Sequence, residues 1–119
     1  MSTSTTREDV LDHHLDAFEN QDLEAVMEDY TDDSTVVTNM GTFRGLDEIE
    51  GLFATLFEEF DHPDASIAME QQLVEDEFGY IVWRAESGEN VYEFATDTFH
   101  IPEDTIEFQT FAGKVAPKE

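Results

Sequence analysis

Cysteine is absent from this 119-residue chain, and lysine and arginine are scarce. Without cysteine, neither a disulfide bond nor a thiolate metal site can form. With only 5 Lys and Arg residues, no basic patch is available to neutralise phosphates, so we expect no direct nucleic-acid binding. No apolar run approaches the ~18 residues of a membrane span. The first nine residues, MSTSTTRED, lack the basic and then apolar order of a signal peptide. We therefore expect a soluble, cytoplasmic protein without membrane contacts.

Acidic residues dominate the charge of the chain. The 30 Asp and Glu residues give a formal net charge of -25 and extend from Glu8 to Glu119. An acidic tail would concentrate them in one block, which the sequence does not do. Molar salt shortens the screening length to about 3 Å and suppresses the self-repulsion of such a surface. The composition therefore favours a halophilic, archaeal protein, and a decoy for nucleic-acid-binding proteins is a distant alternative.

The apolar pattern predicts one domain over residues 1–119, with residues 1–5 as a flexible N-terminus. Hydrophobic residues make up 39% of the chain, and 10 of them are Phe, which is enough for a packed core. Thr6 and Asp9 resemble a capping pair, and apolar residues at helical spacing then predict a first helix over residues 10–18. Asp22 can cap a second, short helix that ends at Tyr30.

The remaining elements predict an α+β fold. TVVTNM is typical of a strand with Val37 and Asn39 on one face. Gly41 and Gly45 bracket a predicted loop, and a strong amphipathic stripe predicts a third helix over residues 49–60. Four strands follow: ASIAMEQQLVE, GYIVWRAES, NVYEFATDTFHI and TIEFQTFAGKV. We expect three N-terminal helices packed on a curved, mostly antiparallel sheet.

The third of these strands places a carboxylate, Asp97, among apolar side chains. A buried ionised carboxylate is costly unless it is paired or hydrogen-bonded, and one left unpaired tends to keep its proton. The pattern therefore predicts either a wet pocket beside Asp97 or a partner for its side chain. The face that carries Asp97 is expected to hold Val91, Glu93, Ala95, Phe99 and Ile101.

The opposite face of this strand carries Tyr92, Phe94 and His100. Aromatic residues on the convex side of the sheet would be exposed in a monomer, and an exposed apolar patch usually marks an interface. We therefore expect a homodimer that forms through this convex face.

Two segments, TNMGTFRGLDEIEGLFATLFEEF and ATDTFHIPEDTIEFQTF, resemble the nuclear-transport-factor-2-like (NTF2-like) superfamily and, within it, the SnoaL-like polyketide-cyclase group. The resemblance extends over residues 6–115. It implies a cone, in which a bent sheet wraps a long helix and encloses a blind pocket, and it implies pairing of sheets back to back. The closing hairpin has Pro102, Glu103 and Asp104 where the family usually has Asp-Gly-Lys, which affects the shape of the turn more than the chemistry.

The resemblance implies that Asp97 is an acid/base residue, because the catalytic cyclases carry an Asp at this position of the late strand. Two further catalytic candidates lie on the helices. His14 lies on the apolar side of the first helix and can donate to a substrate oxygen or pair with Asp97, but a hydrogen-bonded core histidine is the alternative. Tyr30 can supply a phenol hydroxyl to an oxyanion or serve as an anchor.

Four residues are predicted to line the pocket: Asn39, Trp83, Phe99 and Phe53. Asn39 would supply a neutral polar group, and Trp83 would form a stacked wall or part of the core. The acidic clusters and the His13–His14 pair lack the spacing of a known metal motif, so we expect neither a metal nor a cofactor.

Two functions from different classes fit this sequence. The first is a small-molecule enzyme that works by general acid/base catalysis through Asp97, of the isomerase, cyclase or hydrolase type. The second is a non-catalytic ligand-binding or dimeric scaffold domain in which Asp97 is structural. The family contains both kinds of protein, so the fold alone does not decide between them.

Overall fold

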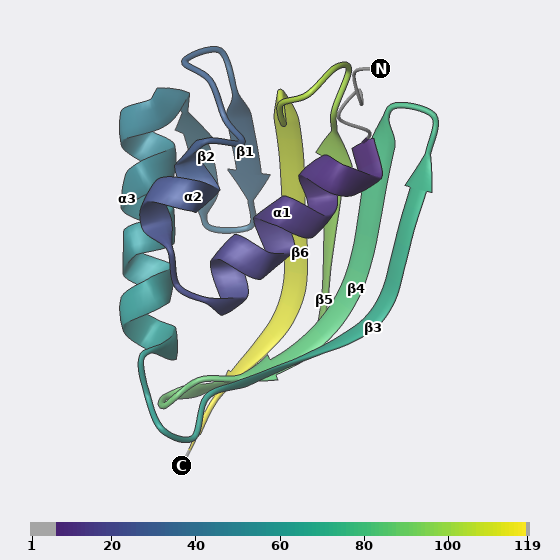
Figure 1. The fold of residues 1–119 in the computed structure, drawn as a ribbon. Helices are drawn as coiled ribbons and strands as arrows, with labels where there is room; N and C mark the ends of the chain where they lie inside the picture. The colour runs from purple at the N-terminus through teal and green to yellow at the C-terminus, as the bar shows by residue number, and fades with distance from the viewer. Residues whose placement is uncertain (1–6, 119) are drawn as a thin grey trace.

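Residues 7–118 are described by a computed structural model, in which three helices pack on one face of a six-stranded sheet (Figure 1). The expected flexible segment 1–5 and the expected cap at Thr6 lie outside the described residues. The helices are α1 (Arg7–Glu19), α2 (Leu23–Met27) and α3 (Gly45–Phe60). The strands are β1 (Thr35–Thr38), β2 (Gly41–Arg44), β3 (Ser66–Glu75), β4 (Phe78–Glu86), β5 (Asn90–His100) and β6 (Phe108–Pro117).

The sheet is mixed and strongly curved. Its strand order is β2-β1-β6-β5-β4-β3, and every neighbouring pair is antiparallel except β1 and β6. Figure 1 shows α1 crossing the concave face in front of β6, β5 and β4, with α3 along the side of β1 and β2. The predicted α+β architecture, with helices packed on a curved and mostly antiparallel sheet, is thus confirmed. The three predicted helices are present, but α2 is a single short turn and α3 follows the first two strands.

The predicted loop between Gly41 and Gly45 is wrong, because most of it forms strand β2. Strands β1 and β2 make a hairpin in which Thr38 pairs with Gly41, so Asn39 and Met40 form its two-residue turn. Asn39 therefore does not share a strand face with Val37, and the buried residue of β1 is Val36. Gly45 has a φ of 81°, a backbone conformation that glycine adopts at little cost, at the junction with α3.

Tyr30 does not end the second helix. That helix ends at Met27, and Tyr30 lies in the following turn, where its backbone N–H donates to the Met27 carbonyl at 3.2 Å. The predicted cap is confirmed, since the Asp22 side chain accepts from the backbone N–H of Ala25 at 3.1 Å.

Two β-bulges bend the sheet and change which residues face the helices. In β3 the extra residue is Glu70. In β5 it is Glu93, because the pairing with β4 shifts register between Tyr92 and Ala95 and the pairing with β6 shifts between Tyr92 and Phe94. The bulge reverses the alternation before it. Tyr92 is therefore buried on the same side as Ala95, whereas Glu93 is exposed. The prediction of Tyr92 on the convex face and Glu93 on the concave face was wrong for this reason.

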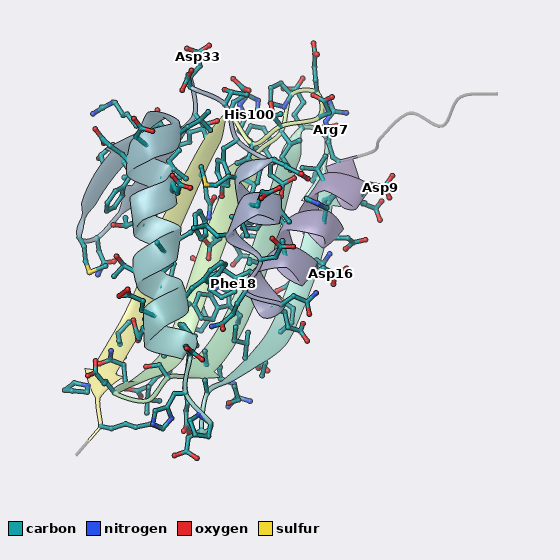
Figure 2. The ribbon with its side chains drawn as sticks, turned by 60° about the vertical axis from the view of Figure 1, so that its left-hand side comes forward. Arg7, Asp9, Asp16, Phe18, Asp33 and His100 are labelled. Carbon is teal, nitrogen blue, oxygen red and sulfur yellow. The ribbon has the colours of Figure 1, made fainter. Side chains whose placement is uncertain are left out.

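The core lies between the helices and the concave face of the sheet. Phe18 points inward from α1 and contacts the rings of Phe53, Phe57 and Phe60 from α3, while Asp9 and Asp16 lie on the outer side of α1 (Figure 2). Edge-to-face aromatic pairs of this kind add about 0.5–1.5 kcal/mol each beyond the area that they bury. Among the described residues, no helix is long and apolar enough to cross a membrane.

Candidate functional site

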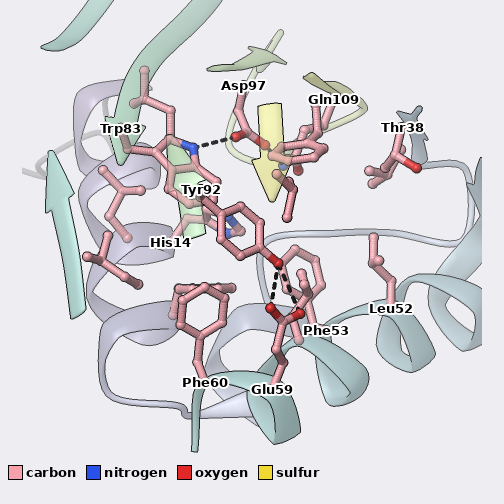
Figure 3. A pocket seen from close by; sticks show the side chains of 18 of the residues that line it. His14, Thr38, Leu52, Phe53, Glu59, Phe60, Trp83, Tyr92, Asp97 and Gln109 are labelled. Carbon is pink, nitrogen blue, oxygen red and sulfur yellow. Dashed lines mark hydrogen bonds between the residues drawn. The ribbon is translucent and has the colours of Figure 1, made fainter. Parts of the chain in front are cut away.

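A pocket of about 500 Å³ lies between α1, α3 and the concave face of the sheet (Figure 3). Its wall is mostly apolar, and none of the Lys or Arg side chains in the described part of the chain lines it. A small number of polar groups in an apolar cavity is typical of a small-molecule site. The polar and amphipathic side chains of the wall are His14, Thr38, Asn39, Thr55, Glu59, Trp83, Asn90, Tyr92, Asp97 and Gln109.

Asp97 lies on the sheet wall of this pocket, and its side chain has one donor on each oxygen. The Trp83 indole Nε1 donates to Oδ1 at 2.8 Å, and the Gln109 Nε2 donates to Oδ2 at 2.8 Å. Both donors come from strands beside β5, which places them next to the carboxylate. A carboxylate can accept about four hydrogen bonds, so these two leave room for a ligand.

Burial raises the pKa of Asp97 above its ordinary value, since only 7% of the residue is exposed. The hydrogen bonds from Trp83 and Gln109, and then the charge of His14, lower this pKa without cancelling the rise. The environment thus favours the protonated acid more than water does. A carboxyl group of this kind can exchange a proton with a bound molecule.

Gln109 links Asp97 to Tyr30. The Tyr30 hydroxyl donates a hydrogen bond to Gln109 Oε1, and Gln109 Nε2 donates in turn to Asp97 Oδ2. Burial, followed by the charges of Asp97 and Asp29, raises the pKa of Tyr30 well above that of an ordinary phenol, so the hydroxyl remains a donor. Tyr30 is therefore committed to Gln109 and does not present a free hydroxyl to the pocket.

The sequence reasoning missed Gln109. It pairs with Phe99 across β5 and β6, on the rows that face the helices. The signal was the alternation in EFQTFAG, which places Gln109 and Phe111 on the face of Asp97, because paired antiparallel strands present side chains to the same face.

His14 lies in the wall opposite the sheet, surrounded by aromatic rings. Its imidazole meets the rings of Tyr30, Phe53 and Phe99 edge to face, at centroid distances of 5.4–5.8 Å. Its Nδ1 is buried without a hydrogen-bond partner and lies 3.7 Å from Asp29 Oδ2. The predicted burial of His14 on the apolar side of α1 is confirmed, but it is not hydrogen-bonded in the way expected for a core histidine.

A second carboxylate, Glu59 of α3, also lines the pocket and was not predicted. It accepts from Ser87 Oγ at 2.7 Å, from Asn90 Nδ2 at 2.9 Å and from the Tyr92 hydroxyl at 2.9 Å. Burial, followed by the hydrogen bond to Glu59, raises the pKa of Tyr92, so this phenol stays protonated. The Tyr92 ring stacks on Trp83 at 5.5 Å, which brings the Glu59 cluster next to Asp97.

All four predicted binding residues line the pocket. Phe53 and Phe99 are buried there, and Trp83 both lines the cavity and holds Asp97. Asn39 also lines the pocket, but from the exposed β1–β2 turn. Within residues 7–118, no group of three or more His, Asp or Glu side chains is arranged to hold a metal ion.

The sequence profile of the SnoaL-like domain matches residues 11–113. This range covers most of the chain, and the chain therefore belongs to the SnoaL-like domain family. No curated protein matches the chain in sequence.

Solved structures share the fold at low sequence identity. One is an NTF2-like protein of unknown function from Cytophaga hutchinsonii, with a TM-score of 0.79, 12% identity, and coverage of 96% of this chain and 95% of that one. A putative polyketide cyclase from Sinorhizobium meliloti has a TM-score of 0.74, 15% identity, and coverage of 87% and 93%. The epoxide hydrolase/cyclase-like enzyme SalBIII, of pyran-ring formation in salinomycin, has a TM-score of 0.78, 13% identity, and coverage of 94% and 95%. These likenesses show the fold alone.

Proposed function

We propose that this SnoaL-like protein binds a small, largely apolar molecule in the cone pocket and that Asp97 acts on it as a general acid/base. The reaction would be of the isomerase, cyclase or hydrolase type and would need no cofactor. The observation that carries the proposal is the position of Asp97, a buried carboxyl group with a raised pKa in the wall of an apolar cavity of about 500 Å³. Structural neighbours described as cyclase and hydrolase/cyclase enzymes support this choice of reaction types.

The charges around the pocket disfavour an anionic ligand. Asp97 and Glu59 both line the cavity, no Lys or Arg in the described residues does, and the chain carries a net charge of -25. An anionic group would meet these carboxylates without a cation to pair with, which costs several kcal/mol in a site of low dielectric. Carboxylates and phosphate esters are therefore poor candidates for the ligand.

A ligand screen with Asp97→Asn tests the proposal. Neutral cyclic molecules would be titrated while the fluorescence of Trp83, the one tryptophan of the chain, is followed, and each mixture would be analysed for product by mass spectrometry. We expect a ligand that the wild type converts and that Asp97→Asn still binds but converts about 10²–10⁴-fold more slowly, the usual contribution of a general acid or base. Turnover that survives in Asp97→Asn would contradict the role of Asp97.

A non-catalytic binding function is the second candidate, and one observation favours it. Each oxygen of Asp97 already accepts an internal hydrogen bond, and Tyr30 is occupied by Gln109. In that case the same screen would give ligands that bind to wild type and to Asp97→Asn and emerge unchanged from both.

The outer face of the sheet is proposed to form a homodimer. Phe94, Phe78 and Phe108 are each more than 40% exposed. Residues 78–82 of β4 pair with residues 96–100 of β5, which pair with residues 108–112 of β6. Within these three segments, none of the side chains on the outer face is a carboxylate, although the chain has 30 Asp and Glu residues. Such a face lets two strongly acidic copies approach without placing like charges opposite one another.

Sedimentation in high salt tests the dimer. We expect Phe94→Glu to convert the dimer to a monomer, because it places a charge in the interface. Met40 is even more exposed and lies in the β1–β2 turn, away from this face, so Met40→Glu is the matched control and should remain dimeric. A monomeric wild type, or equal effects of both variants, would exclude this interface.

We further propose that the protein works in the cytoplasm of a halophilic, archaeal organism. The support is the charge itself, 30 acidic against 5 basic residues distributed along the whole chain. In the structure, most of these acids lie on the exposed surface, where molar salt screens their repulsion.

A further inference from the structure

His14, Asp29 and His13 form a connected row that leads from the pocket to the surface. His14 lines the pocket, and its Nδ1 lies 3.7 Å from Asp29 Oδ2. On the other side of the same carboxylate, His13 Nδ1 lies 2.8 Å from Oδ1 and 3.0 Å from Oδ2. The exposed fraction of the side chain rises outward along the row, from 4% for His14 to 7% for Asp29 and 44% for His13.

Asp29 is a buried carboxylate whose side-chain partners are these two histidines. It follows α2, and its backbone carbonyl accepts from the Ile106 N–H at 2.7 Å, which fixes its position against the sheet. Consecutive residues of a helix point about 100° apart, so His13 and His14 of α1 can hold the carboxylate from two sides. Burying a carboxylate is costly without such partners.

The His14 imidazole is oriented by this carboxylate. A buried ring nitrogen without a hydrogen bond costs about 1–3 kcal/mol, and the Asp29 carboxylate lies within ion-pair distance of Nδ1. With the proton on Nδ1, directed at Asp29, Nε2 on the far edge of the ring has a free lone pair. His14 lines the pocket, and its ring lies behind Tyr92 in Figure 3. Because the Nδ1 edge is turned toward Asp29, we infer that the Nε2 edge borders the cavity. Which nitrogen of a histidine is free is set by the hydrogen bond of the other.

We propose that His14 is a second proton-exchanging residue of the pocket, that Asp29 is its positioning residue, and that His13 holds Asp29 in place. A proton from the ligand would move to the lone pair of Nε2. The resulting imidazolium would be stabilised by the Asp29 carboxylate, and the same proton would return to the ligand at a second position, so that no proton is gained or lost. This rests on the proposed function in one respect, because a molecule that exchanges protons must occupy the pocket.

The other charged and titratable groups around the row are few. Glu28 Oε1 lies 3.6 Å from His13 Nε2 and is exposed. Tyr30 contacts the His14 ring but donates to Gln109, and the charge of His14 lowers the pKa of Asp97 on the sheet side. Asp29 is therefore the one carboxylate within ion-pair distance of His14 in the described residues.

The tautomer of His14 tests this proposal without any ligand. In ¹⁵N-labelled protein at about pH 8, where an ordinary imidazole is neutral, long-range ¹H–¹⁵N correlations distinguish the two tautomers. We expect the wild type to carry the proton on Nδ1. In Asp29→Asn, the new amide N–H can donate to Nδ1. This variant should therefore shift the tautomer ratio toward Nε2–H by about tenfold or more, because an Asn in place of the Asp of a His–Asp pair favours the other tautomer.

A matched control is available at the surface. His100 Nε2 lies 2.9 Å from Glu77 Oε1, a histidine–carboxylate pair away from the pocket, and His100→Gln should leave the His14 tautomer unchanged. Wild-type His14 with its proton on Nε2 would overturn the proposal, even if Asp29→Asn did not fold. So would a folded Asp29→Asn variant with an unchanged tautomer. Failure of the ligand screen would leave this result standing, so the two proposals can fail separately.

Discussion

Replacing Asp97 with Asn tests how a buried carboxylate affects the stability of this fold. Two effects oppose each other. The hydrogen bonds from Trp83 and Gln109 stabilise the charged side chain, at about 1.5–3 kcal/mol each for bonds to a charged group. Desolvation destabilises it and is the largest effect on the pKa of Asp97. Because the pKa is raised, desolvation outweighs the hydrogen bonds.

The magnitude for Asp97→Asn follows from counting donors. The Asn oxygen can accept from only one of the two donors, so one N–H is left unpaired at a cost of about 1–3 kcal/mol. The substitution also removes the desolvation cost of the charge. We therefore expect the free energy of unfolding at neutral pH to change by less than about 2 kcal/mol in either direction.

The contribution of Asp97 to the free energy of unfolding changes with pH in a definite direction. A carboxyl group whose folded pKa is raised contributes stability below its ordinary pKa of 3.8 and loses that contribution as the pH rises through the folded pKa. Wild type should lose up to about 1.4 kcal/mol per pH unit over this window, and the variant has no such group to titrate. The stability of Asp97→Asn relative to wild type should therefore increase with pH and then level off.

Urea unfolding in about 2 M KCl, where surface charges are well screened, would measure both quantities through Trp83 fluorescence. The other carboxyl groups are common to both proteins, so their effects cancel in the difference. A destabilisation above about 3 kcal/mol, the lower limit for losing two charged hydrogen bonds, together with a difference that falls as pH rises, would refute the reasoning. Asp97 would then be a structural residue.

Three further predictions concern salt, the second carboxylate and the indole donor. Lowering KCl from about 1 M to about 0.1 M lengthens the screening distance from roughly 3 to 10 Å, so the Tm in calorimetry should fall steeply. A Tm that does not depend on salt would exclude halophilic adaptation. Glu59→Ala leaves three donors without their acceptor, so the free energy of unfolding in urea should fall by about 2–4 kcal/mol. The control Glu58→Ala, at an exposed neighbour, should lower it by less than about 0.5 kcal/mol. Equal losses of stability would contradict a structural role for the Glu59 cluster. Trp83→Phe removes a donor that lowers the pKa of Asp97, so an NMR titration should show a higher pKa, and no change would contradict the hydrogen bond.

The order of the elements could be predicted because each has a clear period. The stripe of α3 and the alternation from Ala95 to Phe99 are local features, and both are confirmed. Strand β2 was missed because it begins at Gly41 and is followed directly by Gly45, a composition that also suits a loop.

The face of Tyr92 could not be predicted, because a bulge is set by the register of neighbouring strands. Glu93 is an ordinary residue for a strand, and nothing in NVYEF marks it as the extra one. One inserted residue moves every earlier side chain to the other face. The hydrogen-bonded cluster around Glu59 was missed for the same reason, since Glu59 contacts Tyr92 only when the Tyr92 ring points inward.

Asp97, Trp83 and Tyr30 could be singled out from the sequence, but the hydrogen bonds that connect them could not. An acidic residue in an apolar alternation signals a special environment, whatever the tertiary structure. Gln109 and Asp29 are polar residues that many surfaces carry, and the importance of Gln109 depends on a contact with Tyr30, 79 residues away.

The two carboxylates that line the pocket, Glu59 and Asp97, differ in a way that bears on function. Glu59 accepts from three side chains at the end of α3, an arrangement that ties a helix to a hairpin and leaves little capacity for a ligand. Asp97 accepts from two, both of which hold it at the cavity wall, and it remains costly enough to bury that its pKa is raised. A residue that served stability alone would gain from a third donor or from replacement by an apolar side chain. Asp97 instead lies at the cavity wall with capacity for further hydrogen bonds, which agrees with the proposal that a molecule enters the pocket and contacts it.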